Sequence, residues 1–106
     1  MVAPTYFNNA NIDVAGNNVE ISFYSNSGIS TETAIYLGLS TPMPKKISIA
    51  NDKAFVIVGI NGVEFTNPKT VTAGIGFTFE TTFNAAILWI TIRTSDVNSH
   101  FEVMMW

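Results

Sequence analysis

The chain has 106 residues, a formal net charge of −3 and no cysteine. A chain of this length can bury one hydrophobic core, so we expect a single domain over residues 1–106. The absence of cysteine excludes disulfides, thiolate metal sites and a cysteine nucleophile. Five basic residues against eight acidic ones leave no electrostatic footprint for a phosphate backbone, so nucleic acid is not an expected partner.

Short polar side chains dominate the polar part of the sequence. Only 12% of the residues are charged, which is about half of the fraction usual in soluble domains. Thr, Asn and Ser supply 12, 11 and 8 residues, and glutamine is absent. These side chains form hydrogen bonds and lose little entropy when they are ordered, so the surface suits packing against neighbours and also suits a sugar-binding face.

The balance of apolar residues predicts β-structure. Ile, Val and Thr total 33 residues against three Leu, and β-branched side chains favour strands. We expect an all-β protein, a single β-sandwich or jelly-roll-like domain of about eight or nine antiparallel strands. The longest apolar runs are far shorter than the ~20 residues that cross a bilayer as a helix, and no signal-peptide pattern is visible, so no membrane partner is expected.

The first half of the chain predicts an arm and two strands. Residues 1–12 carry no charge and contain a proline, which predicts an extended N-terminal arm or an edge strand. Residues 18–25 alternate between apolar and polar side chains and predict a half-buried strand. Residues 29–39 also alternate and predict a long strand, which ends before Pro42 and Pro44 because proline donates no ladder hydrogen bond.

Two hairpins are expected in the middle of the chain. Residues 45–50 and 54–60 predict strands that a tight turn at Asn51 joins into the first hairpin. Residues 54–60 are apolar on both faces, which predicts a central strand. Asn61-Gly62 predicts a type I′ turn, from which residues 63–66 return as the second hairpin.

The last part of the chain predicts further strands separated by turns. A bulge is expected at Gly74 and Gly76. The strand over residues 85–93 has a mainly apolar second face, so we expect that face to be covered. The expected elements are a turn at 67–70, strands at 71–73, 76–82 and 85–93, a polar link at 94–100, and an apolar C-terminal strand at 101–106.

No catalytic group stands out. His100 is the only imidazole, and Asp96, Ser99 and Glu102 lie near it in sequence, but no nucleophile-elbow motif accompanies them. We therefore expect His100 to be a solvent-exposed residue of a connector. No acid–base pair, nucleophile or metal cluster rises above chance, so we expect neither an enzyme nor a cofactor or metal.

The chain ends carry the strongest hint of an interface. The strand at 101–106 has one charged residue and is too apolar to fray in water, so it must dock on its own core or on a partner. Methionine adapts its shape to a partner, and aromatic residues bury large areas. We expect an interface that contains Tyr6, Phe7, Met104, Met105 and Trp106.

These features favour a non-enzymatic structural protein that packs into a larger assembly. The expected partners are copies of the chain itself, as a homo-oligomer, and capsid or tail proteins. By analogy with other small β-domains, the chain is expected to decorate or cement a phage-like capsid or to belong to a tail. The expected location is the virion or an extracellular surface.

A carbohydrate-binding, lectin-like module is the alternative. Three aromatic side chains, Tyr24, Tyr36 and Trp89, could stack on a sugar if they lie together on an exposed face of a sheet. The many Asn and Thr residues would then bind the sugar hydroxyls. A glycan is therefore an alternative partner.

Overall fold

Nine strands form two β-sheets, which confirms the expected all-β fold. The computed structural model describes residues 8–38, 44–81 and 86–106. These ranges contain no helix that is long and apolar enough to cross a membrane. The strands are β1 (Asn8–Val14), β2 (Glu20–Tyr24), β3 (Ala34–Tyr36), β4 (Lys46–Asn51), β5 (Phe55–Ile60), β6 (Val63–Val71), β7 (Phe77–Glu80), β8 (Trp89–Thr94) and β9 (Ser99–Met105).

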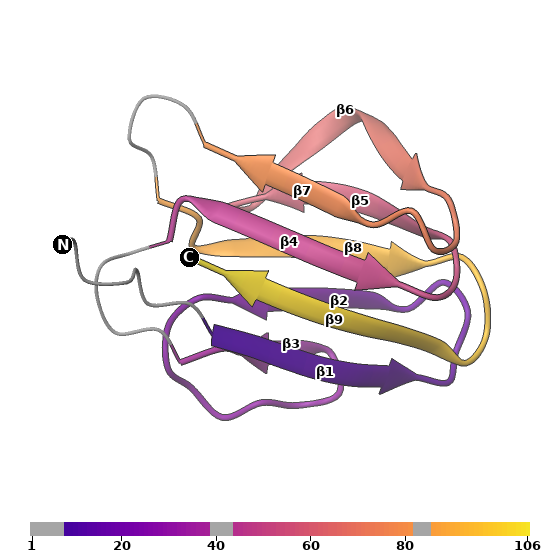
Figure 1. The fold of residues 1–106 in the computed structure, drawn as a ribbon, viewed down its shortest axis with the longest axis horizontal. Helices are drawn as coiled ribbons and strands as arrows, with labels where there is room; N and C mark the ends of the chain where they lie inside the picture. The colour runs from indigo at the N-terminus through magenta and orange to yellow at the C-terminus, as the bar shows by residue number, and fades with distance from the viewer. Residues whose placement is uncertain (1–7, 39–43, 82–85) are drawn as a thin grey trace, which may run out of the picture.

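The strand order is that of one long hairpin folded over on itself. The four-stranded sheet has the order β1-β9-β4-β7 and lies in front of the five-stranded sheet, β3-β2-β8-β5-β6, in Figure 1. If β3 is set aside, β1 pairs with β9, β2 with β8, β4 with β7 and β5 with β6, each antiparallel. Successive pairs alternate between the sheets, which is the winding of a jelly roll. The sandwich expectation is confirmed.

The strand expected over residues 29–39 is much shorter than predicted. Only Ala34–Tyr36 form a strand, β3, and it pairs with β2 in parallel, so the expectation of purely antiparallel pairing is wrong. Hydroxyl groups bend the segment before β3: Thr31 Oγ1 accepts hydrogen bonds from two of the next three backbone N–H groups, and Ser30 Oγ accepts one from Tyr36 at 3.0 Å. Such bonds compete with strand pairing.

The hairpin expected between residues 45–50 and 54–60 is wrong. Both segments are strands, but β4 pairs with β7 and β9, whereas β5 lies between β6 and β8 in the other sheet. The connection crosses between the sheets, and the buried Asn51 side chain holds it there. Asn51 Nδ2 donates to the carbonyls of Lys53 and Thr72 at 2.8 and 3.0 Å, and its Oδ1 accepts from the Gly76 N–H at 2.9 Å.

The expected turn at Asn61-Gly62 is confirmed. Its two residues have φ angles of 54° and 78°, the positive values that a type I′ turn requires. The strand that follows, β6, continues through the turn expected at residues 67–70. Pairing with β5 shifts register there, so that residues 65–68 stand opposite a single residue. An edge strand with a bulge accommodates proline, which explains why Pro68 does not end β6.

The later elements follow the prediction with shifted bounds. The expected bulge at Gly74 and Gly76 is a turn instead, in which both residues have positive φ and the chain crosses to the four-stranded sheet. Strand β8 begins at Trp89, later than the predicted residue 85. The predicted alternation between buried and exposed side chains breaks just before it, since Ile87 is buried and Leu88 is exposed. The outward face of β8 is half-buried rather than covered by described residues.

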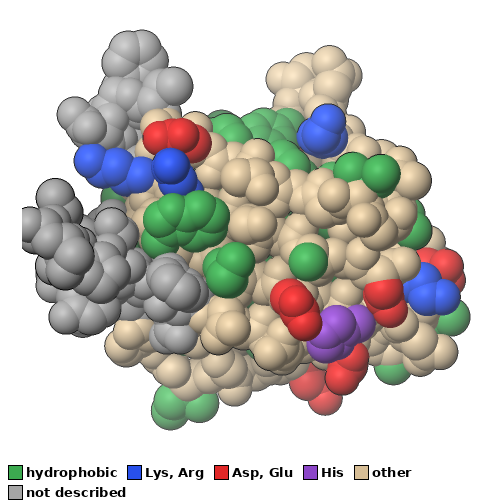
Figure 2. Space-filling view, viewed as in Figure 1, with side chains coloured by type: hydrophobic (Ala, Val, Ile, Leu, Met, Phe, Trp, Pro, Cys, Tyr) green, Lys and Arg blue, Asp and Glu red, His purple; other side chains and the backbone are tan. Residues whose placement is uncertain are grey.

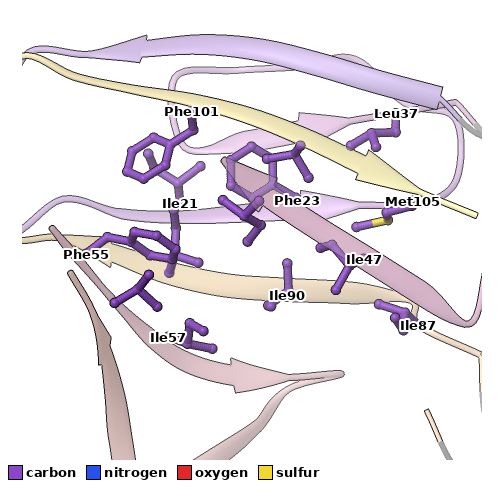
Figure 3. Packing of buried hydrophobic residues seen from close by; sticks show 14 of the residues in the cluster. Ile21, Phe23, Leu37, Ile47, Phe55, Ile57, Ile87, Ile90, Phe101 and Met105 are labelled. Carbon is purple, nitrogen blue, oxygen red and sulfur yellow. The ribbon is translucent and has the colours of Figure 1, made fainter. Parts of the chain in front are cut away.

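Alternate side chains of both sheets meet in one core. Figure 3 shows that Phe101 of β9 and Phe55 of β5 approach one another across the sandwich, with ring centroids 5.2 Å apart and planes at 87°. Met105 is also completely buried in this core, and Figure 3 shows it beside Ile47. The core cluster comprises Val14, Ile21, Phe23, Leu37, Ile47, Ile49, Phe55, Ile57, Val71, Ile87, Ile90, Ile92, Phe101, Val103 and Met105.

Candidate functional site

The outer face of the four-stranded sheet, which we call the front face, is the first candidate site. Strand alternation turns one set of side chains toward the core and the other outward. Trp106 extends this pattern past β9, because its backbone exchanges two hydrogen bonds with Lys46, at 2.9 and 3.0 Å. The outward side chains are Asn9, Asn11, Asp13, Lys46, Ser48, Ala50, Thr78, Glu80, His100, Glu102, Met104 and Trp106.

An uncharged row crosses the front face from edge to edge. Register places Asn9, Met104, Ser48 and Thr78 side by side on the four strands. Met104 is 37% exposed, and Thr78 Oγ1 lies 3.4 Å from Ser48 Oγ. The charged side chains of the face lie on either side of this row, and Figure 2 shows acidic side chains and the histidine gathered at one end of the face. The row therefore has an apolar centre with charges only at its borders.

Two of the five expected interface residues lie on the front face. Met104 is exposed and Trp106 is half-buried there. The expectation for Met105 is wrong, because this side chain alternates with Met104, points inward and is completely buried. Tyr6 and Phe7 lie outside the described residues.

One end of the front face holds a cluster around His100. His100 Nδ1 lies 2.7 Å from Asp13 Oδ1 of β1, and Nε2 lies 3.7 Å from Glu102 Oε1. The hydrogen bond with Asp13, aided by the charges of both carboxylates, raises the pKa of His100 above 6.5, while partial desolvation opposes the rise. Asp52 also approaches, since its Oδ1 accepts from the His100 backbone N–H at 2.7 Å. The cluster thus forms one charged border of the front face.

The expectation that His100 lies in an exposed connector is wrong. It is the second residue of β9 and pairs with Asp13, because β1 runs alongside β9. Neither ring nitrogen has a hydroxyl partner among the described residues, so the Asp13–His100 pair activates no nucleophile there. The described ranges also contain no group of three or more His, Cys, Asp or Glu residues placed to hold a metal ion.

The protonation of His100 gives a testable pH dependence. We expect its NMR titration midpoint to lie above 6.5, to fall in Asp13→Asn and to fall less in Glu102→Gln. Because folding raises this pKa, the Asp13–His100 pair contributes stability in full below the unfolded-state pKa of ~6.5 and loses it as pH rises through the folded-state pKa. An unchanged midpoint in Asp13→Asn would show that the two side chains are not paired in solution.

The three expected sugar-stacking residues form one column on the outer face of the five-stranded sheet. Tyr24 lies between the other two: its ring centroid is 4.7 Å from that of Tyr36, with planes at 13°, and 5.6 Å from that of Trp89, with planes at 30°. Register explains the column, because Tyr24 of β2 is paired with Tyr36 of β3 on one side and Trp89 of β8 on the other. The column pins the short strand β3 to the sheet.

A glycine lies against each end of this aromatic column. A Cβ at Gly28 would lie 2.5 Å from two Tyr36 ring carbons and 2.8 Å from a third, so Gly28 lies over the ring face turned away from Tyr24. A Cβ at Gly62 would lie 2.9 Å from Trp89 Cζ2, so this turn glycine rests against the edge of the indole. Both faces of Tyr24 and of Tyr36 and one face of Trp89 are therefore already in contact.

A shallow hollow of about 250 Å³ opens beside the column. It lies where β2 and β3 end and β8 begins, and all three aromatic residues of the column line it. Its remaining lining includes the exposed Asn26 and Leu88. The hollow thus combines aromatic edges, one apolar side chain and one amide, a set that suits a small polar ligand better than a charged one.

No protein-family model matches the chain, and the searches of the curated proteins and of the solved structures returned no match. The fold and its two surfaces are therefore the basis of the functional assignment.

Proposed function

We propose that this chain is a non-enzymatic structural protein whose front face packs against a protein neighbour in a larger assembly. The observation that carries the proposal is the uncharged row centred on the exposed Met104, with charges confined to its borders. Protein interfaces have this anatomy, in which charge is depleted at the centre and kept at the rim. Met104 at the centre and Trp106 at the border beside Lys46 supply apolar area.

The short side chains of the front face support the same function. Asn9, Asn11, Ser48 and Thr78 lose little rotamer entropy when a neighbour covers them, and each carries hydrogen-bonding groups. The jelly-roll winding is shared with viral capsid domains, and this analogy of fold supports a virion as the assembly. In that setting the chain would decorate or cement a capsid or belong to a tail.

Co-sedimentation with particles tests the proposed function. The tagged chain, produced in the organism that encodes it, is expected to sediment with large particles in a density gradient. Met104→Glu places a charge at the centre of the face, and we expect it to leave most of the chain at the top of the gradient while the melting temperature stays within a few degrees, as is usual for an exposed site.

Ile75→Glu is the matched control. Ile75 is 74% exposed in the β6–β7 turn, away from the front face, so the same charge there should leave sedimentation unchanged. Wild-type chain that stays at the top of the gradient, or a Met104→Glu chain that sediments like wild type, contradicts packing through this face.

Carbohydrate binding is a second candidate, favoured by the convergence of Tyr24, Tyr36 and Trp89 beside the hollow. Because Gly28 and Tyr24 cover both faces of the Tyr36 ring, a sugar would contact the ring edges of Tyr24 and Trp89 and the amide of Asn26. We expect the Trp89 indole NMR signal to shift on addition of a suitable sugar from a panel at about 10 mM, as for weak sites. Asn26→Ala should abolish the shift and leave the stack intact, and no response to any sugar excludes this candidate.

A further inference from the structure

The charges on the front face are arranged so that the face complements itself. Lys46 and Glu80 stand on one side of the uncharged row, in an ion pair of 3.8 Å. Glu102 stands on the other side, two residues before Met104 on β9 and one strand away from Ala50 of β4. Beyond Glu102 lie Asp13 and Asp52, with Lys53 next to Asp52 in the β4–β5 turn. The Lys46–Glu80 ion pair on one side and an acidic border on the other thus flank a neutral centre.

We infer that the partner of the front face is a second copy of this chain, related by a two-fold axis that crosses the strands at the level of Met104. This inference rests on the proposed function, because it assigns an occupant to the same face. A two-fold axis makes an isologous interface, in which the same patch serves both subunits. The axis lies between the two faces, perpendicular to the strands.

With the axis perpendicular to the strands, the uncharged rows of the two subunits lie face to face. Met104 meets Met104 of the partner subunit at the axis, where flexible thioethers pack well. Because the axis reverses the direction along each strand, Lys46 comes over Ala50 of the partner subunit. Glu102 of the partner subunit is then one strand away, about 4.8 Å, a distance that a lysine side chain spans. Each dimer contains this pair twice.

The alternative axis, parallel to the strands, is electrostatically worse. Rotation about this axis leaves each residue at the same position along the strand direction. Glu102 therefore lies near Glu102 of the partner subunit, and Lys46 lies near Lys46 of the partner subunit. Like charges then approach at the acidic border, which opposes association, whereas the Lys46–Glu80 border carries one charge of each sign. The charge pattern therefore selects the perpendicular axis.

The size of the face sets the strength of the pairing. Four strands about 4.8 Å apart, of 7, 7, 6 and 4 residues at about 3.4 Å per residue, cover roughly 400 Å². A standard interface buries about 800 Å² on each partner, so the pair is a weak dimer, populated at about 0.1–1 mM. Weak contacts of this kind gain strength when an assembly holds the chain at several places at once.

A charge swap tests the inference. Sedimentation equilibrium of the purified chain should show a dimer that weakens as salt rises, because the rim pairs are exposed to solvent. Lys46→Glu and Glu102→Lys should each raise the dissociation constant about tenfold, since each substitution acts at two symmetry-related sites. The double variant carries both reversed charges and should restore the wild-type constant.

Lys69→Glu serves as the control for net charge, because Lys69 lies in the exposed edge strand β6 of the other sheet, and it should leave the constant unchanged. A wild-type chain that is monomeric at 1 mM overturns the self-pairing, as do equal constants for all variants or a double variant weaker than both single variants. None of these results bears on particle sedimentation, so a failure of the two-fold pair is distinguishable from a failure of the proposed function.

Discussion

Phe101→Ala is expected to remove a large part of the stability of the fold. Phe101 is completely buried, and its edge-on contact with Phe55 joins the two sheets. Truncation of a buried phenylalanine to alanine costs about 3–5 kcal/mol, out of a total of about 5–15 kcal/mol for a domain of this kind. At roughly 4–8 °C per kcal/mol, the melting temperature should fall by about 12–40 °C in thermal unfolding, and urea unfolding should show the same loss of stability.

Two further variants distinguish the loss of core packing from the mere removal of an aromatic ring. Phe101→Leu keeps much of the volume and should cost less than half as much as Phe101→Ala. Phe65→Ala removes the same ring from the edge strand β6, where Phe65 is 37% exposed, and should cost much less. If Phe101→Ala melts within a few degrees of the wild type, the two sheets do not pack through this contact.

Alternation in the sequence predicted most strands, because side-chain direction is a local property of an extended chain. Ile21 and Phe23, the apolar side chains of the alternating segment 18–25, point inward, and Phe101 and Val103 of β9 also point inward. The same alternation buries Met105 beside the exposed Met104. The interface prediction missed this because it rested on the apolar composition of the chain end and not on side-chain direction. Strand bounds failed where side chains bond to the backbone, as Ser30 does before β3.

Strand pairing beyond the Asn61-Gly62 hairpin could not be predicted, because it joins residues that are far apart in the chain. The two-layer winding places β4 and β5 in different sheets although a short polar turn connects them. The aromatic column needs β3 and β8 on either side of β2, and the pair of Asp13 with His100 spans 87 positions in sequence. The residue types of the column were recognisable, but their convergence was not.

Buried polar side chains stand where the folded hairpin crosses between sheets. Thr94 Oγ1 donates to the Gly16 carbonyl and accepts from the Val19 N–H, both at 3.0 Å, and so ties the β1–β2 connection to the end of β8. Ser25 at the end of β2 is bonded to the Leu88 carbonyl before β8. Asn51 ties the β4–β5 connection to the β6–β7 connection. The sandwich is thus held by apolar packing inside and by single polar groups at its crossings.

Asn51→Asp tests the role of these polar groups at the site where they are most numerous. The substitution keeps the shape and the acceptor for Gly76, but a carboxylate replaces the amide that donates to the Lys53 and Thr72 carbonyls. Two buried acceptors then face a buried negative charge, so we expect a loss of about 2–4 kcal/mol at neutral pH in urea unfolding.

The pH dependence of this loss separates charge from shape. Burial against two carbonyls raises the pKa of the new carboxyl above its unfolded value of ~3.9, so the neutral form is favoured in the folded state. The penalty relative to wild type should therefore grow as pH rises through the raised pKa and shrink below ~3.9, where the protonated carboxyl donates one hydrogen bond. Asn67→Asp, on the exposed edge strand β6, makes the same chemical change without burial and should stay close to wild type at every pH. Equal stability of the two variants at neutral pH would mean that Asn51 does not hold the crossing, and the turn alone would then have to place β4 and β5 in different sheets.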